Sequence, residues 1–154
     1  MDKKHVPEAM NQEQVQNILK FIDSTQSEPV KRAIFSQLGR ECFACGHHAE
    51  HLAPFKDNVQ AFLDIINVEQ KSKYWESLSL SEDQTELVLT GRKVEGCACA
   101  FADCSQPPLS LCHYCCKLFQ EMYFKTLFNR EVEVEITEAF LLGHERCSTL
   151  VRFR

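Results

Sequence analysis

Cysteine is the residue type best able to support chemistry in this chain, which contains nine of them in 154 residues. Thiolates are preferred ligands of Zn²⁺ and of iron–sulfur clusters, so two converging cysteine pairs could hold either group. Free cysteine is also among the residues most often buried, and the same thiols could instead line a packed cavity. Both interpretations apply to the densest group, which comprises Cys97, Cys99, Cys104, Cys112, Cys115 and Cys116.

A second group, earlier in the chain, combines thiols with imidazoles. Cys42 and Cys45 are three positions apart, which places both on one face of a helix. They could bind zinc together with His47, His48 and His51. Alternatively, the two cysteines are small core residues and the histidines lie at a helix end, where cationic side chains are favoured. The strand and turn that accompany a redox Cys-x-x-Cys motif are not predicted here.

The spacing identifies no acid–base pair. Glu131, Glu133 and Glu135 alternate with apolar residues, which predicts a solvated strand face. His113 directly follows Cys112, and neighbouring residues on a helix point about 100° apart. Catalytic residues are therefore unknown, and an enzyme would depend on a cysteine thiolate near this helix.

The composition is that of one ordinary globular domain. Hydrophobic residues make up 44% and charged residues 25% of the chain, and the net charge is −5. This acidic balance excludes a general nucleic-acid-binding surface, and no apolar run reaches the roughly 18 residues that a membrane span needs. We expect a cytoplasmic protein with a single domain over 1–154, helical over 1–80 and of α+β type over 81–154.

The first half of the chain is predicted to be helical. Apolar residues recur at helical spacing over 11–23, 27–38 and 54–68, with Asn11 as the first N-cap. Gly39 is expected to stop or kink the second helix. The polar segment 69–83 is interpreted as a linker or a short helical turn.

The second half is predicted to form an antiparallel sheet with one packed helix. A strand is expected over 86–94 and a second short strand over 97–101, followed by a helix over 110–128. Strict alternation over 131–138 and again over 147–153 predicts a closing hairpin whose turn contains Gly143. The predicted fold class is therefore α+β, with a helical N-terminal half and a C-terminal hairpin.

The order of these parts resembles that of a known domain type. The segments carrying the likeness are Gly96–Phe101, Pro107–Cys116, Phe128–Arg130 and the Gly-x-x-x-Cys turn Gly143–Cys147. Over about 86–154 they resemble the vinyl reductase type small-molecule-binding domain. They are still more similar to an uncharacterised bacterial family related to it and to L-2-amino-thiazoline-4-carboxylic acid hydrolase-like proteins. The stretch Gly39–Cys42 is also similar to the first part of that bacterial family.

The resemblance implies an α+β domain that encloses an apolar cavity for a hydrophobic or planar small molecule. It also implies zinc beside that cavity, with Cys112 or Cys115 and Cys147 as ligands. The glutamate and second cysteine of the zinc motif fall at Ile136 and at Ala139 or Phe140 in this chain, so Cys97 or Cys99 would have to supply the missing ligands. In the hydrolase-like group an aspartate follows the helix-start cysteine by three positions; here that position is Cys115, so a mechanism needing the carboxylate would not transfer.

Two functions follow from these observations. The first is a small-molecule-binding or sensor-type domain, for which no cofactor is assigned and zinc is the candidate metal. Its ligand-binding candidates are Cys97, Cys99, Phe101, Cys112, Cys115 and Phe119, and its metal candidates are Cys97, Cys99, Cys112, Cys115 and Cys147. The second is a hydrolase of a small heterocyclic or amide substrate that uses a cysteine thiolate. The N-terminal helices could also form a homodimer interface.

Overall fold

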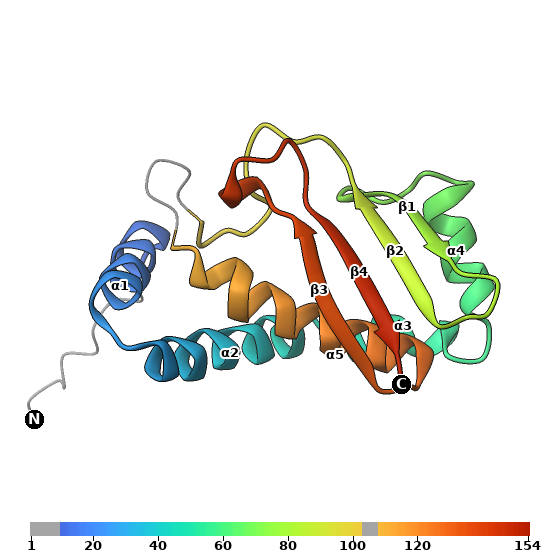
Figure 1. The fold of residues 1–154 in the computed structure, drawn as a ribbon, viewed down its shortest axis with the longest axis horizontal. Coiled ribbons are helices and arrows are strands. Elements are labelled where there is room, and N and C mark those ends of the chain that lie inside the picture. The colour runs from blue at the N-terminus through green and yellow to red at the C-terminus, as the bar shows by residue number, and fades with distance from the viewer. Residues whose placement is uncertain (1–9, 103–107) are drawn as a thin grey trace, which may run out of the picture.

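The computed structural model describes residues 10–102 and 108–154, which form a layer of helices against one antiparallel sheet. Figure 1 shows the elements in chain order from blue to red. The helices are α1 (Gln12–Thr25), α2 (Glu28–Cys45), α3 (His48–Leu52), α4 (Val59–Asn67), the π-helix η2 (Leu111–Cys116) and α5 (Lys117–Phe128). The strands are β1 (Trp75–Leu80), β2 (Glu86–Gly91), β3 (Val132–Glu138) and β4 (Ser148–Phe153). Two 3₁₀ turns, η1 (Ala53–Phe55) and η3 (Phe140–Leu142), complete the set.

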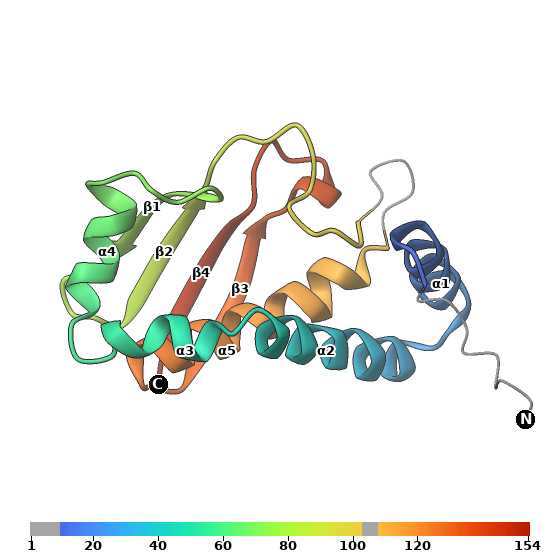
Figure 2. The same ribbon diagram turned by 180° about the vertical axis from the view of Figure 1, so that it is seen from behind.

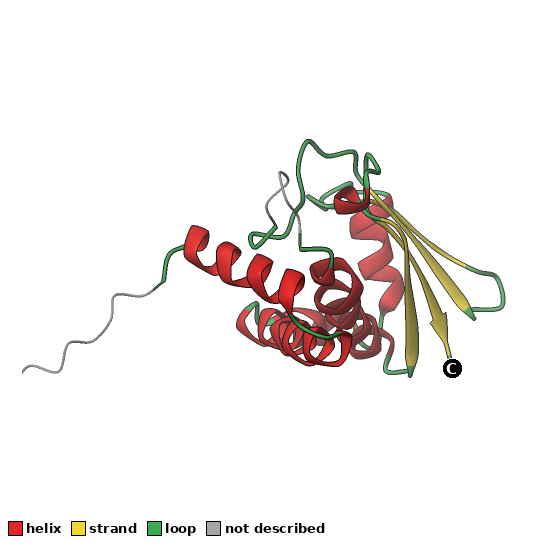
Figure 3. Cartoon of the chain, turned by 60° about the vertical axis from the view of Figure 1, so that its left-hand side comes forward, coloured by secondary structure: helices red, strands yellow, loops and turns green. Residues whose placement is uncertain are grey.

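The α+β fold class predicted from the sequence is confirmed. The four strands are ordered β1-β2-β4-β3, and each neighbouring pair is antiparallel. The predicted closing hairpin is formed by β3 and β4, in which Val134 lies opposite Val151 and both are buried. The helices gather on one face of the sheet, as the side view in Figure 3 shows. The other face carries Glu133, Glu135 and Arg152, in agreement with the alternation.

The core consists of two apolar clusters. The first joins the sheet to α4 and α5 through side chains such as Leu87, Phe124 and Val151, each with no exposed surface. The second joins α1, α2 and η2 through Leu19, Phe35 and Leu111. Helix α2 runs alongside η2 and α5, as both Figure 1 and Figure 2 show. Burial of these clusters is the main force that holds η2 and α5 between α2 and the sheet.

Three expectations about local structure are wrong. Gly39 does not stop its helix, because α2 continues to Cys45. The segment 69–83 is no mere linker, since it contains strand β1, whose bulge between Trp75 and Ser77 interrupts the alternation. Residues 97–101 form no strand; they are irregular chain that packs on the second core cluster.

The helix expected over 110–128 forms, but its first part is a π-helix. Ser110 precedes the π-helix η2, which passes directly into α5. A π-helix has more residues per turn than an α-helix, so residues four positions apart line up better than residues three apart. Cys112 and Cys116 therefore share a face, whereas Cys115 turns toward α2. Short π-helical segments are frequent at functional sites.

None of the helices in the described part of the chain combines the length and the apolar character needed to cross a membrane.

Candidate functional site

Cysteines from three other segments lie near the cysteines of η2. Cys112 lies within electrostatic reach of Cys97, Cys99 and Cys147, which come from the irregular segment before η2 and from the hairpin after β3. Next to desolvation, the residue that most strongly raises the pKa of Cys115 is Cys42 of α2, and the two side chains form a hydrogen bond. Sulfurs distant in the sequence thus converge on the π-helix.

Burial keeps the thiols of η2 protonated. Cys112 and Cys115 are 7% and 5% exposed, and loss of hydration raises the pKa of each thiol well above its usual range. The same effect raises the pKa of Cys116 to about 12. A nucleophilic cysteine needs a lowered pKa, so the environment of Cys112 and Cys115 disfavours the thiolate chemistry of a hydrolase.

The cysteines do not assemble into a zinc site. In the ranges 10–102 and 108–154, no set of three or more His, Cys, Asp or Glu side chains is arranged to hold a metal ion. Cys112 and Cys115 diverge on the π-helix, and the two zinc-motif positions held by Ile136 and Ala139 pack in the apolar second cluster. Zinc therefore does not fit the described residues. Cys104 lies outside them.

The predicted group of cysteines and histidines is dispersed over α2 and α3. Cys45 is exposed, while Cys42 is half-buried and faces Cys115. His47 pairs with Glu50 at the surface. His48 instead enters an aromatic cluster, where its ring lies 5.0 Å from that of Phe119, 5.7 Å from that of Tyr123 and 5.7 Å from that of Phe43. His48 is therefore a packing residue that joins α3 to α2 and α5.

Acid is expected to weaken the fold through His48. Desolvation, reinforced by the nearby His51, lowers the pKa of His48 below 6.5, its ordinary unfolded value. The folded state therefore favours the neutral ring, and stability is lost as the pH falls below the unfolded pKa toward the folded one. We expect the free energy of unfolding, measured in urea between about pH 7.5 and 5, to fall less steeply in His48→Phe than in the parent. Removal of the exposed imidazole by His47→Asn should leave the slope unchanged; equal slopes in all three proteins would contradict this assignment.

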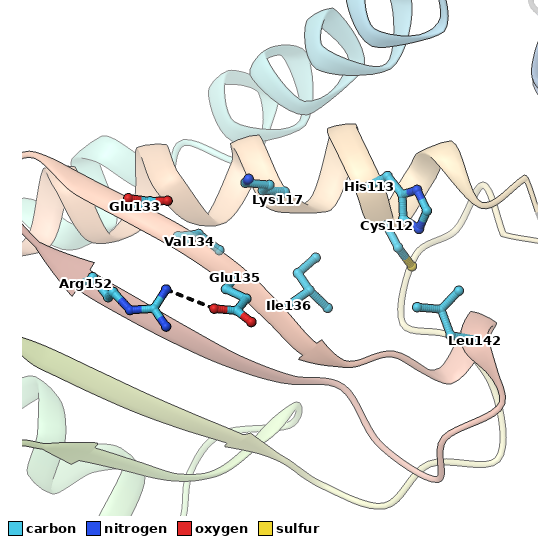
Figure 4. A pocket seen from close by; sticks show the side chains of 9 residues that line it. All are labelled: Cys112, His113, Lys117, Glu133, Val134, Glu135, Ile136, Leu142 and Arg152. Atoms are coloured by element: carbon cyan, nitrogen blue, oxygen red, sulfur yellow. Dashed lines mark hydrogen bonds and ion pairs between the residues drawn. The ribbon is translucent and has the colours of Figure 1, made fainter. Parts of the chain in front are cut away.

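A groove of about 380 Å³ lies between the helix η2–α5 and strand β3. Figure 4 shows Cys112, His113 and Lys117 on the helix side and Glu133, Val134, Glu135 and Ile136 on β3. Because β3 is an edge strand, the groove follows its edge and is lined by side chains from both faces of the sheet. The lining is completed by Leu142 of η3 at one end and Arg152 of β4 at the other. The full lining comprises Cys112, His113, Lys117, Glu133, Val134, Glu135, Ile136, Leu142 and Arg152.

The groove has an apolar end and a charged end. Cys112, Ile136 and Leu142 form the apolar end (Figure 4). At the charged end Arg152 donates to Glu135 over 2.9 Å and also pairs with Glu86 at 3.4 Å. Such exposed pairs contribute little stability, but they fix the side chains that frame the opening.

Lys117 is the cation of the groove whose charge is least compensated. The Arg154 guanidinium binds Glu133 over 2.6 Å and is the main cause of the lowered pKa of that carboxyl, whereas Lys117 contributes only a weak long-range effect. Lys117 itself forms no ion pair with any residue that the structure describes. The half-buried ammonium is therefore available to a negatively charged group placed in the groove.

In α5, Gln120 contributes an unsatisfied polar atom. Its side chain is 9% exposed, and Nε2 donates to the Sγ of Cys116 over 3.3 Å. The Oε1 atom is buried and accepts no hydrogen bond from the described residues. A buried acceptor without a donor costs about 1–3 kcal/mol, so this site favours a water molecule or another donor.

The predicted ligand residues are distributed over three surroundings. Cys112 lines the groove. Cys97, Cys99 and Phe101 pack against the second core cluster, beside the groove's apolar end. Cys115 faces α2, and Phe119 stacks in the aromatic cluster with His48. Cys147 accepts a hydrogen bond from the Phe140 backbone N–H at 3.4 Å, so its thiol helps to fix the hairpin.

The sequence interpretation missed Lys117, Leu142 and Arg152. Charged residues on a helix or a strand ordinarily indicate a solvated face, and Leu142 is 46% exposed in a short turn. The alternation of β3 was the one available signal for this site. It predicts that Val134 and Ile136 share an apolar face of the strand and that another element packs against that face.

No protein family and no curated protein matches the sequence. The fold, in contrast, is similar to known structures. The trafficking protein particle complex subunit 3 from Naegleria fowleri, covalently bound to palmitic acid, has a TM-score of 0.50 at 14% identity, over 93% of this chain and 92% of that one.

Two further structures share the fold. An H-NOX protein from S. oneidensis in the Fe(II)NO ligation state has a TM-score of 0.54 at 12% identity, over 99% of this chain and 82% of that one. The phenol-responsive sensory domain of the transcription activator PoxR, with phenol, has a TM-score of 0.55 at 10% identity, over 94% of this chain and 75% of that one. The likeness is one of fold.

Proposed function

We propose that this chain is a small-molecule-binding, sensor-type domain whose ligand occupies the groove between η2–α5 and β3. The observation that carries the proposal is the groove itself, whose volume of about 380 Å³ lies in the range of small-molecule sites. Its helix side is built on the π-helix, a departure from regular geometry of the kind that is frequent at functional sites.

The lining defines the chemistry of the ligand. Cys112, Val134 and Ile136 offer apolar surface between a helix and a strand, which suits a flat or hydrophobic body. Lys117 lies on the helix wall without an ion-pair partner among the described residues. We therefore propose a planar or hydrophobic molecule that carries an acidic group, with the acid directed to Lys117.

Related folds support a ligand-binding function. The structures with this fold are described with palmitic acid, with Fe(II)NO and with phenol, all of them small groups. The resemblance of residues 86–154 to the vinyl reductase type domain points to the same kind of function, and the kinship itself stays a prediction. Because fold alone does not determine function, the groove residues and not the likeness must be tested.

In this proposal the cysteines close the inner end of the groove. Cys112 lies in the groove wall, and Cys97, Cys99 and Cys147 lie within electrostatic reach of it. Protonated thiols behave as small, weakly polar groups, so together they form a soft apolar end for a ligand. The proposal includes no metal. It treats residues 1–154 as a single domain.

Binding of a planar anion should depend on Lys117. The fluorescent anion anilinonaphthalene sulfonate is a suitable probe, because it combines an aromatic body with one negative charge. We expect Lys117→Glu to weaken its binding by about tenfold or more, since one charge-assisted contact of about 1.5–3 kcal/mol is replaced by repulsion. Fluorescence titration of the folded protein at low salt measures the dissociation constant.

Lys125→Glu is the matched control, since Lys125 is an exposed lysine on the same helix α5 outside the groove. It makes the same change of net charge and should leave binding within about twofold. Neutral phenol, as a second probe, should bind the parent and Lys117→Glu alike. Absence of probe binding to the parent, or an equal loss in both variants, would refute the groove as the ligand site.

A further inference from the structure

The backbones of α2 and η2 are in close contact at one point, where Gly39 faces Cys115. A Cβ atom built on Gly39 would lie 2.5 Å from the carbonyl oxygen of Cys115, so only glycine permits this approach. Cys42 is three residues further along α2 and lies on the same face of the helix. Its side chain is hydrogen-bonded to that of Cys115. The contact between the helices thus places two thiols against each other.

The two thiols differ in their access to solvent. Cys42 is half-buried at the surface of α2, whereas Cys115 is only 5% exposed. A small oxidant can therefore reach the first sulfur, and the second sulfur is held beside it. The hydrogen bond between the two thiols and the close backbone approach at Gly39 turn the side chains toward each other, which is one of the geometric requirements of a disulfide.

We propose that Cys42 and Cys115 are a site of reversible oxidation, at which a hydroperoxide forms a disulfide that links α2 to η2. The Cys42 thiolate attacks the peroxide O–O bond, which gives a sulfenic acid and releases water or an alcohol after protonation of the leaving oxygen. The Cys115 thiol then attacks the sulfenic sulfur and passes its proton to the departing hydroxyl, so that the S–S bond forms and water leaves. The two thiols lose two electrons and two protons, and the peroxide is reduced.

The surroundings of Cys42 indicate when this reaction occurs. Desolvation raises the pKa of the Cys42 thiol, and Cys99, Cys45 and Glu41 raise it further, while the hydrogen bond with Cys115 opposes them. Only a small fraction is therefore thiolate near neutral pH, so the pair stays reduced until oxidant accumulates. This inference does not depend on ligand binding, although η2 also carries the groove residues Cys112 and His113.

The test treats the full chain with hydrogen peroxide and maps its peptides without reduction. We expect a linked peptide pair containing Cys42 and Cys115, smaller by two hydrogens than the sum of the free peptides. The bond would close a loop of about 70 residues, so the melting temperature should rise by roughly 5–10 °C and return after dithiothreitol.

The exposed Cys45 provides the matched control. Cys42→Ser and Cys115→Ser should each abolish the linked pair and the rise in melting temperature, whereas Cys45→Ser should retain both. A Cys42–Cys45 bridge, a bridge between other thiols, or a full stability gain in Cys115→Ser would overturn the proposal. The peptide map of the parent protein decides the pairing even if a serine variant fails to fold.

Discussion

Gly39→Ala is expected to destabilise the protein by about 3 kcal/mol, although alanine is the better helix former. In an ordinary helix interior this change would stabilise by about 1 kcal/mol. Here the new Cβ would lie 2.5 Å from the Cys115 carbonyl oxygen and 3.3 Å from the carbonyl carbon, both backbone atoms that cannot rotate away. The helices α2 and η2 would have to separate, which opens the second core cluster around Phe35 and Leu111. Urea unfolding at neutral pH measures the difference.

The control for Gly39→Ala is Ala44→Gly, at an exposed position of the same helix. That variant isolates helix propensity and should lose about 1 kcal/mol. A gain of stability in Gly39→Ala would show that α2 and η2 are not in close backbone contact, and it would also remove the basis for the Cys42–Cys115 pair.

Gly91→Ala is expected to cost a similar amount at the opposite side of the cysteine cluster. Gly91 ends β2, and a Cβ there would lie 2.0 Å from the carbonyl oxygen of Cys147, just before β4 begins. Because β2 and β4 are paired along their length, the strain would displace the hairpin or break the last pairs of the ladder. We expect a loss of about 3 kcal/mol in urea unfolding.

Gly143→Ala separates backbone strain from steric conflict. Gly143 has φ +92°, which favours glycine, but a Cβ there would meet no atom within 4 Å. Its cost should be about 1–2 kcal/mol, clearly below that of Gly91→Ala. Equal losses in the two variants would mean that backbone conformation, and not the contact with Cys147, determines the effect at Gly91.

The elements that could be predicted from the sequence are those specified by local chemistry. Asn11 caps α1 through a reciprocal bond with Gln14, and the alternation of Val132, Val134 and Ile136 is realised as β3. Strand β1 was missed because it is short and its bulge interrupts the period of two. The segment from Cys97 to Phe101 is a short apolar run, yet a strand also needs a neighbour to pair with, which such a run alone does not specify.

The candidate site was predictable only in part. The expectation that thiols converge near the start of the last helix stays a prediction, although Cys97 and Cys147 do influence the pKa of Cys112. Their arrangement depends on the π-helix, and no residue pattern in 111–116 indicates one. Cys42 and Cys115 are 73 positions apart, and their contact depends on how α2 packs against η2. Spacing along the chain cannot reveal that packing.

The π-helix η2 and the α-helix α5 form one continuous helix. The wider turn of η2 determines how side chains at its N-terminal end are oriented relative to those of α5. Phe124 and Leu127 anchor α5 on the sheet, so the C-terminal end of this continuous helix is fixed. The wider turn within Leu111–Cys116 accommodates extra chain without disturbing that anchor. Removing a single residue from this turn would let it rewind as an α-helix that is one residue shorter, so the side chains on both sides of the turn would keep nearly the same orientation while the residues inside it shift by one position. Sequences with this architecture could thus exchange the thiol at the groove for another side chain by a one-residue deletion, while the sheet and its packed helix remain intact.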